Sequence, residues 1–202
     1  MTPSQRFARL VTDVVVRAPF LWPFFRRPLT RLFDAVAPQW DTFASAERLT
    51  AFEAALDAVP DPPERVVDLG TGTGEAALAI ARRWPDADVL GLDVSPEMVA
   101  EARRKAGDRV RFEVADARRL PVPDASFDLV AMNNMIPFFD ELARVVAPGG
   151  QLVMAFSRGP ETPIFVAPEK IRRELGRRGF QLECELAAGP GTAIVARRAG
   201  PD

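Results

Sequence analysis

From Glu64 onward, short apolar runs alternate with longer segments in which apolar residues recur at helical spacing. This alternation is typical of βαβ units, in which helices connect the parallel strands of one sheet. Strands are predicted near residues 65–69, 88–93, 109–115, 127–133, 151–157, 180–187 and 192–197. Helices are predicted between them at residues 75–84, 96–105, 138–146 and 169–178. The chain is therefore expected to build one mostly parallel α/β sheet.

Proline and glycine mark the expected ends of these elements. Pro148-Gly149-Gly150 is expected to end the helix before the fifth strand, and Gly189-Pro190-Gly191 to form a hairpin turn between the last two strands. Before Glu64 several short helices are expected, because the helical pattern is interrupted by Pro19, Pro23, Pro28 and Pro38. Prolines at 60 and 63 indicate a boundary between a helical extension, residues 1–60, and the sheet domain, residues 61–202.

The composition excludes several kinds of chemistry. The 202 residues are 48% hydrophobic, which suits a folded domain, and their net charge of −2 does not favour nucleic acid as a partner. Histidine and tyrosine are absent, so any proton transfer would use carboxylates, Lys105 or Lys170, Cys184, or water. A reaction that depends mainly on the placement of the reactants, without a metal, is expected.

The sequence also predicts where the protein works. A single cysteine, Cys184, cannot form an intramolecular disulfide, which favours a reducing, cytoplasmic setting. Arginines and prolines interrupt residues 11–25, so no membrane-spanning helix is expected there. A secretory signal is not expected either, since no clean apolar segment with a small-residue cleavage site begins the chain.

An apolar strand runs directly into a glycine-rich turn and a helix at Val66-Val67-Asp68-Leu69-Gly70-Thr71-Gly72-Thr73-Gly74-Glu75. Glycine permits a sharp turn and lets a ligand lie against the backbone, while the helix that follows presents free N–H groups. A dinucleotide fingerprint needs G-x-G-x-x-G, whereas the third glycine here comes one position early. The spacing therefore disfavours a nicotinamide cofactor.

This block resembles motif I of the class I S-adenosylmethionine-dependent methyltransferases, most like those grouped as methyltransferase type 11. The second strand ends at Asp93, where a carboxylate can accept both hydroxyls of a ribose. Further segments resemble this family in the same order along the chain. Residues 114–117 resemble its third-strand Asp-Ala, and residues 120–124 and 127–130 its L-P-x-x-D and F-D sequences. Residues 142–150 resemble its approach to the fifth strand.

The resemblance implies a Rossmann-like, doubly wound α/β fold: a mostly parallel seven-stranded sheet with an antiparallel C-terminal strand and an N-terminal helical extension. It implies methyl transfer from S-adenosylmethionine, with S-adenosylhomocysteine as the product and no metal. Asp116 would accept from the adenine amino group and the Ala117 N–H would reach a ring nitrogen. Val94 and Met98 would pack on the adenine faces. The cofactor-binding residues expected in this way are Asp68, Gly70, Thr71, Gly72, Gly74, Asp93, Val94, Met98, Asp116, Ala117 and Asn133.

Several of these residues also have a purely structural explanation. Asp68 could stabilise its own turn, and Asp93 could cap the helix that begins at Pro96. Asp116 could be an ordinary loop residue and Met98 a core side chain. Their order at successive strand ends favours a cofactor site, because ligands in such sheets bind at the carboxyl ends of the strands.

Upstream, residues 33–41 (FDAVAPQWD) resemble the family's Y-D-x-x-A-x-x-Y-D element, with other aromatic residues in place of both tyrosines. In the family this element folds over the cofactor. Phe33 and Trp40 are therefore candidates to cover the sulfonium, whose positive charge an aromatic face attracts. They are equally candidates for core anchors of a helical cap.

Residues 1–33 form a separate electrostatic region, with six arginines against one acid, a charge of +5. Within it the aromatic stretch 20–25 (FLWPFF) is flanked by Arg17, Arg26 and Arg27. Such a stretch suits peripheral contact with an anionic membrane or cover for a lipophilic acceptor. It also suits packing against its own domain with solvated arginines.

The loop after the fourth strand, residues 133–139, is mostly apolar and borders the methyl-donor end in related enzymes. Asn134 and Met135 are candidates for acceptor or cap contacts, and Asn133 either positions the cofactor or ends the strand. Asp140 is a candidate general base, although an acid at a helix start also stabilises the helix. The acceptor is expected to be a small, apolar or aromatic molecule.

Three functions fit the sequence. The leading one is a methyltransferase that aligns its acceptor for in-line displacement. A non-catalytic protein that binds S-adenosylmethionine as a sensor or as part of a complex is the second, suggested by the missing tyrosines and bases. A nicotinamide-dependent oxidoreductase is the third. The sequence does not specify an oligomeric state.

Overall fold

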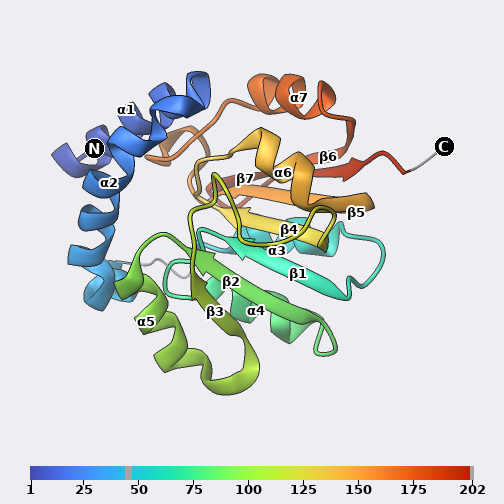
Figure 1. Cartoon of the computed structure of the whole chain (residues 1–202), viewed down its shortest axis with the longest axis horizontal. Coiled ribbons are helices and arrows are strands. Elements are labelled where there is room, and N and C mark those ends of the chain that lie inside the picture. Colours follow the sequence, from blue (N-terminus) through green and yellow to red (C-terminus); the bar gives the residue numbers. More distant parts are fainter. Residues whose placement is uncertain (44–46, 201–202) are drawn as a thin grey trace.

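The computed structural model describes residues 1–43 and 47–200, in which seven strands form one sheet (Figure 1). The strands are β1 (Arg65–Leu69), β2 (Asp88–Asp93), β3 (Arg111–Val114), β4 (Phe127–Asn133), β5 (Val146–Phe156), β6 (Phe180–Ala188) and β7 (Gly191–Arg198). Their order is β3-β2-β1-β4-β5-β7-β6. The pairs among β1 to β5 are parallel, and β7 is antiparallel to both β5 and β6. The predicted fold class is confirmed.

Helices cover both faces of the sheet because its central strands are apolar on both sides. On one face α3 (Thr50–Asp57), α4 (Glu75–Arg83) and α5 (Pro96–Ala106) pack on the strands, with Phe52 and Ile80 fully buried. On the other face lie α6 (Phe139–Val145) and α7 (Pro168–Gly176), with Leu142 and Ile171 buried. The sheet is therefore held between two apolar layers.

One prediction about the ends of elements was wrong, and another is confirmed. The helix before the fifth strand ends at Val145, and the strand begins at once, so Pro148-Gly149-Gly150 lies within β5. The β4–β5 register shifts between Phe127 and Leu129, and Gly149 has φ +78°, so a bulge rather than a separating loop absorbs these residues. The hairpin at 189–191 is confirmed, with Gly189 at φ +55° between β6 and β7.

The N-terminal region contains two longer helices where several short ones were predicted. α1 (Pro3–Arg17) and α2 (Trp22–Val36) each have 15 residues, joined by a 3₁₀ turn at Pro19–Leu21. Pro23 lies in the first turn of α2, where its missing N–H costs nothing, but Pro28 lies inside the helix and does not end it. A second 3₁₀ segment, Ala37–Phe43, follows α2.

These N-terminal helices lie along the carboxyl edge of the sheet. In Figure 1 the blue α1 and α2 stand at the side toward which the arrows of β1 and β4 point. A buried cluster that includes Val11, Trp22 and Leu29 packs there against Ile136 and Phe138, from the loop after β4. The strand order reverses between β1 and β4, and in open α/β sheets this is the place where ligands bind.

Other short 3₁₀ turns lie at Gly107–Arg109 and Gly159–Glu161. Within the described ranges, the structure has no helix with the length and apolar character needed to span a bilayer.

Candidate functional site

The glycine turn after β1 exposes backbone toward the N-terminal helices. Gly70, Gly72 and Gly74 have φ values of +69°, +54° and +87°, a left-handed region that favours glycine. A Cβ on Gly70 would lie 2.5 Å from Cγ of Met135, so this position is closed by packing. At Gly72 the nearest atom is Nε1 of Trp40 at 3.9 Å, so the backbone there is approachable. A ligand can lie against the turn at Gly72.

Asp68 holds this turn from the interior of the protein. Its side chain is fully buried, and its Oδ2 accepts a 2.6 Å hydrogen bond from Oγ1 of Thr71. Burial raises the pKa of Asp68 to about 7, as does the charge of Asp93, although the Thr71 hydrogen bond opposes the shift. Among the described residues its Oδ1 has no hydrogen-bond partner. Asp68 therefore acts on the conformation of the turn.

Asp93, at the end of β2, is oriented by two backbone donors. The N–H of Gly72 donates to Oδ2 and that of Ser95 to Oδ1, each at 2.9 Å. Burial raises the pKa of Asp93, while these two hydrogen bonds act in the opposite direction. Each carboxylate oxygen has a second lone pair. Asp93 is thus held against the glycine turn with capacity for two further donors, such as the hydroxyls of a ribose.

The loop after β2 joins this site to α2. Ser95 caps α5, accepting from the Met98 N–H at 3.1 Å, and its own Oγ donates to Oδ1 of Asp34 at 2.5 Å. Met98 is 2% exposed and belongs to the interior, while Val94 remains half-buried beside the N-terminal cluster. Of these two, Val94 is the one placed to meet a ligand.

Asp116, after β3, is bound by the N-terminal helix. The Trp22 indole N–H donates to Oδ1 at 2.8 Å, and the Arg26 guanidinium pairs with Oδ2 at 3.0 Å. The Arg118 N–H also donates to Oδ1, and the neighbouring Ala117 is half-buried. Trp22 and Arg26 were not among the predicted site residues, because no local pattern links residues so far apart in sequence.

The loop after β4 provides one unsatisfied acceptor and one structural tie. Asn133 donates from Nδ2 to the Arg48 carbonyl at 3.5 Å, and its buried Oδ1 has no partner among the described residues. Asn134, at φ +58°, accepts from the Ser157 N–H at 2.8 Å and donates to its Oγ at 2.9 Å. Asn134 thus connects the ends of β4 and β5, while Asn133 presents a free acceptor.

Phe33 and Trp40 pack on each other at the glycine turn. Their ring centroids are 6.0 Å apart in an edge-to-face arrangement, and both side chains are half-buried. The Arg48 guanidinium lies 5.8 Å from the Trp40 ring and also pairs with Glu75 in the first turn of α4. The aromatic pair is therefore next to the candidate site and available to cover a ligand there.

Asp41 adds a further tie between the N-terminal segment and the turn. It accepts from Thr73 Oγ1 at 2.7 Å and forms an ion pair with Lys105. Although burial opposes the change, hydrogen bonds from Lys105 and Thr73 hold the pKa of Asp41 below its usual value. Residues 22–41 and Arg48 thus contact the segments at the carboxyl ends of β1, β2, β3 and β4.

Asp140 and Glu141 have different surroundings at the start of α6. Asp140 is 89% exposed and pairs with Arg178 at 2.7 Å. Glu141 is buried and accepts from the Leu120 N–H and from Arg144, both at 2.6 Å. These contacts hold Asp140 at the surface in one ion pair and place Glu141 in a structural network.

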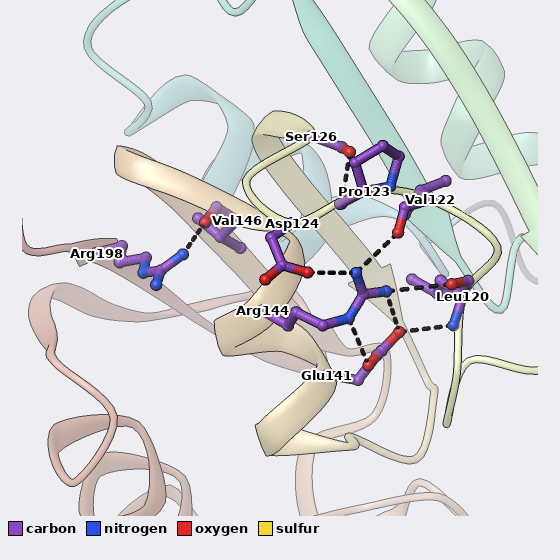
Figure 2. Close-up of polar contacts among 9 residues, drawn as sticks. All are labelled: Leu120, Val122, Pro123, Asp124, Ser126, Glu141, Arg144, Val146 and Arg198. Atoms are coloured by element: carbon purple, nitrogen blue, oxygen red, sulfur yellow. Dashed lines mark hydrogen bonds and ion pairs between the residues drawn. The ribbon is translucent and has the colours of Figure 1, made fainter.

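Arg144 is the centre of that network, which Figure 2 shows. Besides Glu141, its guanidinium donates to the carbonyls of Leu120 and Val122 and to the carboxylate of Asp124. The hydrogen bonds of Arg144 to Glu141 and Asp124 raise its pKa, and the charges of the two carboxylates act in the same direction. Because the network holds residues 120–124, it also fixes the loop that leads from Asp116.

A cavity of about 870 Å³ adjoins Asp116 on the side of this network and does not include the glycine turn. It is lined by Arg26, Asp116, Arg118, Arg119, Leu120, Val122, Glu141 and Arg144. Across the described ranges, no group of three or more histidine, cysteine or acidic side chains has an arrangement that would hold a metal ion.

Comparison with known proteins matches residues 66–150 to a family described as a methyltransferase domain. A demethylmenaquinone methyltransferase of Thermus thermophilus is 43% identical over 141 residues, 61% of this chain and 63% of that protein. A malonyl-[acyl-carrier protein] O-methyltransferase of Halorhodospira halophila is 39% identical over 148 residues, 68% of this chain and 50% of that protein. The chain thus spans between half and two thirds of the length of these relatives.

Among solved structures, a SAM-dependent methyltransferase from Aquifex aeolicus superimposes with a TM-score of 0.67 at 20% identity. The likeness covers 80% of this chain and 97% of that one. At this level of identity it shows a common fold.

Proposed function

We propose that this chain, which belongs to the class I S-adenosylmethionine-dependent methyltransferases, transfers a methyl group to a small molecule held under its N-terminal helices. The observation that carries the proposal is the Asp93 carboxylate, bound by the Gly72 N–H at the carboxyl edge of parallel strands. The approachable backbone of Gly72 lies against it, and the unsatisfied Oδ1 of Asn133 lies at the end of β4, on the other side of β1.

These residues fit S-adenosylmethionine part by part. Asp93 would accept from the ribose hydroxyls, since each of its oxygens retains a lone pair. Asn133 Oδ1 would accept from the ammonium group of the methionine part, which removes the cost of a buried acceptor without a donor. The remaining predicted contacts, at Asp116, Ala117 and Val94, are part of the same proposal.

When bound, S-adenosylmethionine supplies an electrophilic methyl group on a positively charged sulfur. The chain's contribution is to hold the acceptor in line and to exclude water. Phe33 and Trp40 would cover the sulfur, because aromatic faces attract a positive charge. Asp140 has no part in this proposal, since its carboxylate is exposed and paired with Arg178. The acceptor's proton would pass to water.

The acceptor is proposed to be an apolar or aromatic molecule with an acidic hydroxyl or ring carbon. The support is the character of the loop after β4 and of α2, where Met135, Ile136, Phe138 and Trp22 gather. The name of the Thermus relative, a demethylmenaquinone methyltransferase, points to the same class. A cytoplasmic setting, expected from the single cysteine, remains a prediction.

The test is release of S-adenosylhomocysteine in the presence of a panel of acceptors: quinols, simple phenols, malonyl thioesters and aliphatic carboxylic acids. We expect turnover with the quinols or phenols, and loss of turnover in Asp93→Asn. Arg82→Gln, an exposed change on α4, is the matched control and should keep full activity. Tight binding of S-adenosylmethionine with no product from any acceptor would favour the sensor function. Binding of NAD instead would favour the oxidoreductase.

A further inference from the structure

The outer side of α2 has a basic and aromatic surface that the proposed reaction does not use. Phe20, Phe24, Arg27 and Arg31 follow one another at spacings of four, three and four residues, which places them on one side of a helix. Phe20, in the turn before α2, is 69% exposed, and Phe24 is 74% exposed. We call these four residues the arm surface.

The exposed apolar side chains are concentrated in this region. Six large hydrophobic side chains are exposed in the described residues, and four of them, Met1, Leu10, Phe20 and Phe24, lie within residues 1–24. A water-exposed phenylalanine is unfavourable unless something covers it, so two adjacent ones on one helix side indicate an interaction.

The charges beside them lack partners. Over residues 1–43 and 47–200, no carboxylate is within ion-pair distance of Arg27, Arg31, Arg17 or Arg6. Arg26, by contrast, forms an ion pair with Asp116. The acid on the neighbouring outer side of α1 is Asp13, next to Leu10 and Arg17. The arm surface is therefore positive as well as apolar.

We propose that the arm surface docks this protein on an anionic lipid bilayer. Arginines beside exposed aromatic side chains are typical of helices that lie in the membrane interface, where arginine meets lipid phosphates and phenylalanine enters the acyl boundary. Exposures near 70% mean that the two rings stand out from the surface. Protruding rings suit insertion into a deformable bilayer better than the preformed pocket of an acidic protein.

The position of α2 gives this docking a consequence for the reaction. Trp22 and Leu29, on its inner side, pack over the candidate site, while the arm surface faces outward. Docking would therefore bring the cover of the site against the bilayer, where a lipophilic acceptor accumulates. This consequence depends on the proposed function, whereas the docking itself does not.

The test is co-sedimentation of the purified full chain with vesicles of phosphatidylcholine containing 30% phosphatidylglycerol, and with vesicles of phosphatidylcholine alone, at low salt. We expect the protein to pellet with the anionic vesicles, with binding reduced severalfold or more by 0.5 M salt or by omitting the anionic lipid. Equal recovery in the supernatant with both vesicle types overturns the proposal.

Two double variants separate charge from insertion. Arg27→Gln with Arg31→Gln should weaken vesicle binding by about fivefold per arginine, and Phe20→Ser with Phe24→Ser by about tenfold or more. Arg82→Gln with Arg104→Gln, on exposed sides of α4 and α5, makes the same charge change elsewhere and should leave binding unchanged. An equal loss in this control pair overturns the assignment to the arm surface.

Sedimentation equilibrium distinguishes a second copy of the chain as the occupant. A wild type that dimerises without vesicles, and becomes monomeric when Phe20 and Phe24 are replaced by serine, would overturn the bilayer proposal. Because vesicle binding involves no methyl transfer, a failure of this proposal is distinguishable from a failure of the proposed function. Circular dichroism melting confirms that each variant is folded.

Discussion

Replacing Asp68 by asparagine should change how stability depends on pH. In the folded protein the Asp68 carboxyl is fully buried, and burial raises its pKa to about 7, against 3.8 for an aspartate in water. Asparagine resembles the protonated acid in shape, and its carbonyl can still accept from Thr71. The variant therefore keeps the turn and removes the titration.

The direction follows from proton uptake. Because the pKa of Asp68 is higher in the folded state, the folded protein retains a proton that the unfolded chain releases. The free energy of unfolding that this proton contributes is complete below about pH 4 and is lost as the pH rises through 7. With pKa values of about 7 and 3.8, the loss between pH 5 and pH 8 is about 2 to 3 kcal/mol. For a domain of this size it corresponds to roughly 5 to 10 °C in Tm.

The assay is urea unfolding of the wild type and of Asp68→Asn at pH 5, 6, 7 and 8. The difference between the two proteins should move by about 2 to 3 kcal/mol in favour of the variant as the pH rises. Asp128→Asn is the control. Although burial acts to raise the pKa of Asp128, Arg65 holds it below its usual value. Removing this carboxylate should therefore not alter how the free energy of unfolding changes with pH above pH 5. A constant difference between wild type and Asp68→Asn over the whole range would refute the assignment of a buried, titrating carboxyl.

Arg144→Gln should lower the free energy of unfolding in urea by about 2 kcal/mol, because Glu141 loses its buried partner. The control Arg158→Gln, at an exposed ion pair, should lower it by less than about 0.5 kcal/mol. Equal losses in the two variants would contradict the role of Arg144 in the network. Trp22→Phe keeps the apolar packing but removes the hydrogen-bond donor to Asp116, so thermal melting should show a loss of about 1 kcal/mol in the free energy of unfolding. An unchanged Tm would mean that this contact does not hold α2. Gly72→Ala should weaken S-adenosylmethionine binding by about tenfold or more through its added Cβ. Gly107→Ala also adds a Cβ at positive φ, but in open space, so it should strain the backbone without affecting affinity. Parallel losses of affinity would place the ligand elsewhere.

Much of the sheet could be predicted because its strands carry local signals. The apolar runs that gave β1, β2 and β4 agree with the structure to the residue, since each is bounded by turn residues on both sides. The errors came where local signals conflict with long-range pairing. Pro148 to Gly150 are typical of a loop, but the pairing of Val146 with Phe127 of β4 places the start of β5 at Val146.

The candidate site was predicted only in part for the same reason. Glycines and aspartates at strand ends are visible in the sequence because strand and turn are adjacent. The contacts of Trp22 and Arg26 with Asp116 join residues about ninety positions apart, and no periodicity marks them. Pro28 inside α2 was misread because local propensity does not include tertiary packing, and here the burial of Trp22 and Leu29 holds the helix despite the proline.

Titration calorimetry with S-adenosylmethionine tests the central claim most directly, using the wild type and Asp93→Asn, each shown by thermal melting to be folded. The account predicts binding of one equivalent by the wild type and an affinity lower by about tenfold or more in the variant, since the hydrogen bonds of two ribose hydroxyls depend on that carboxylate. Equal affinity in both proteins, or no binding by the wild type, would contradict it.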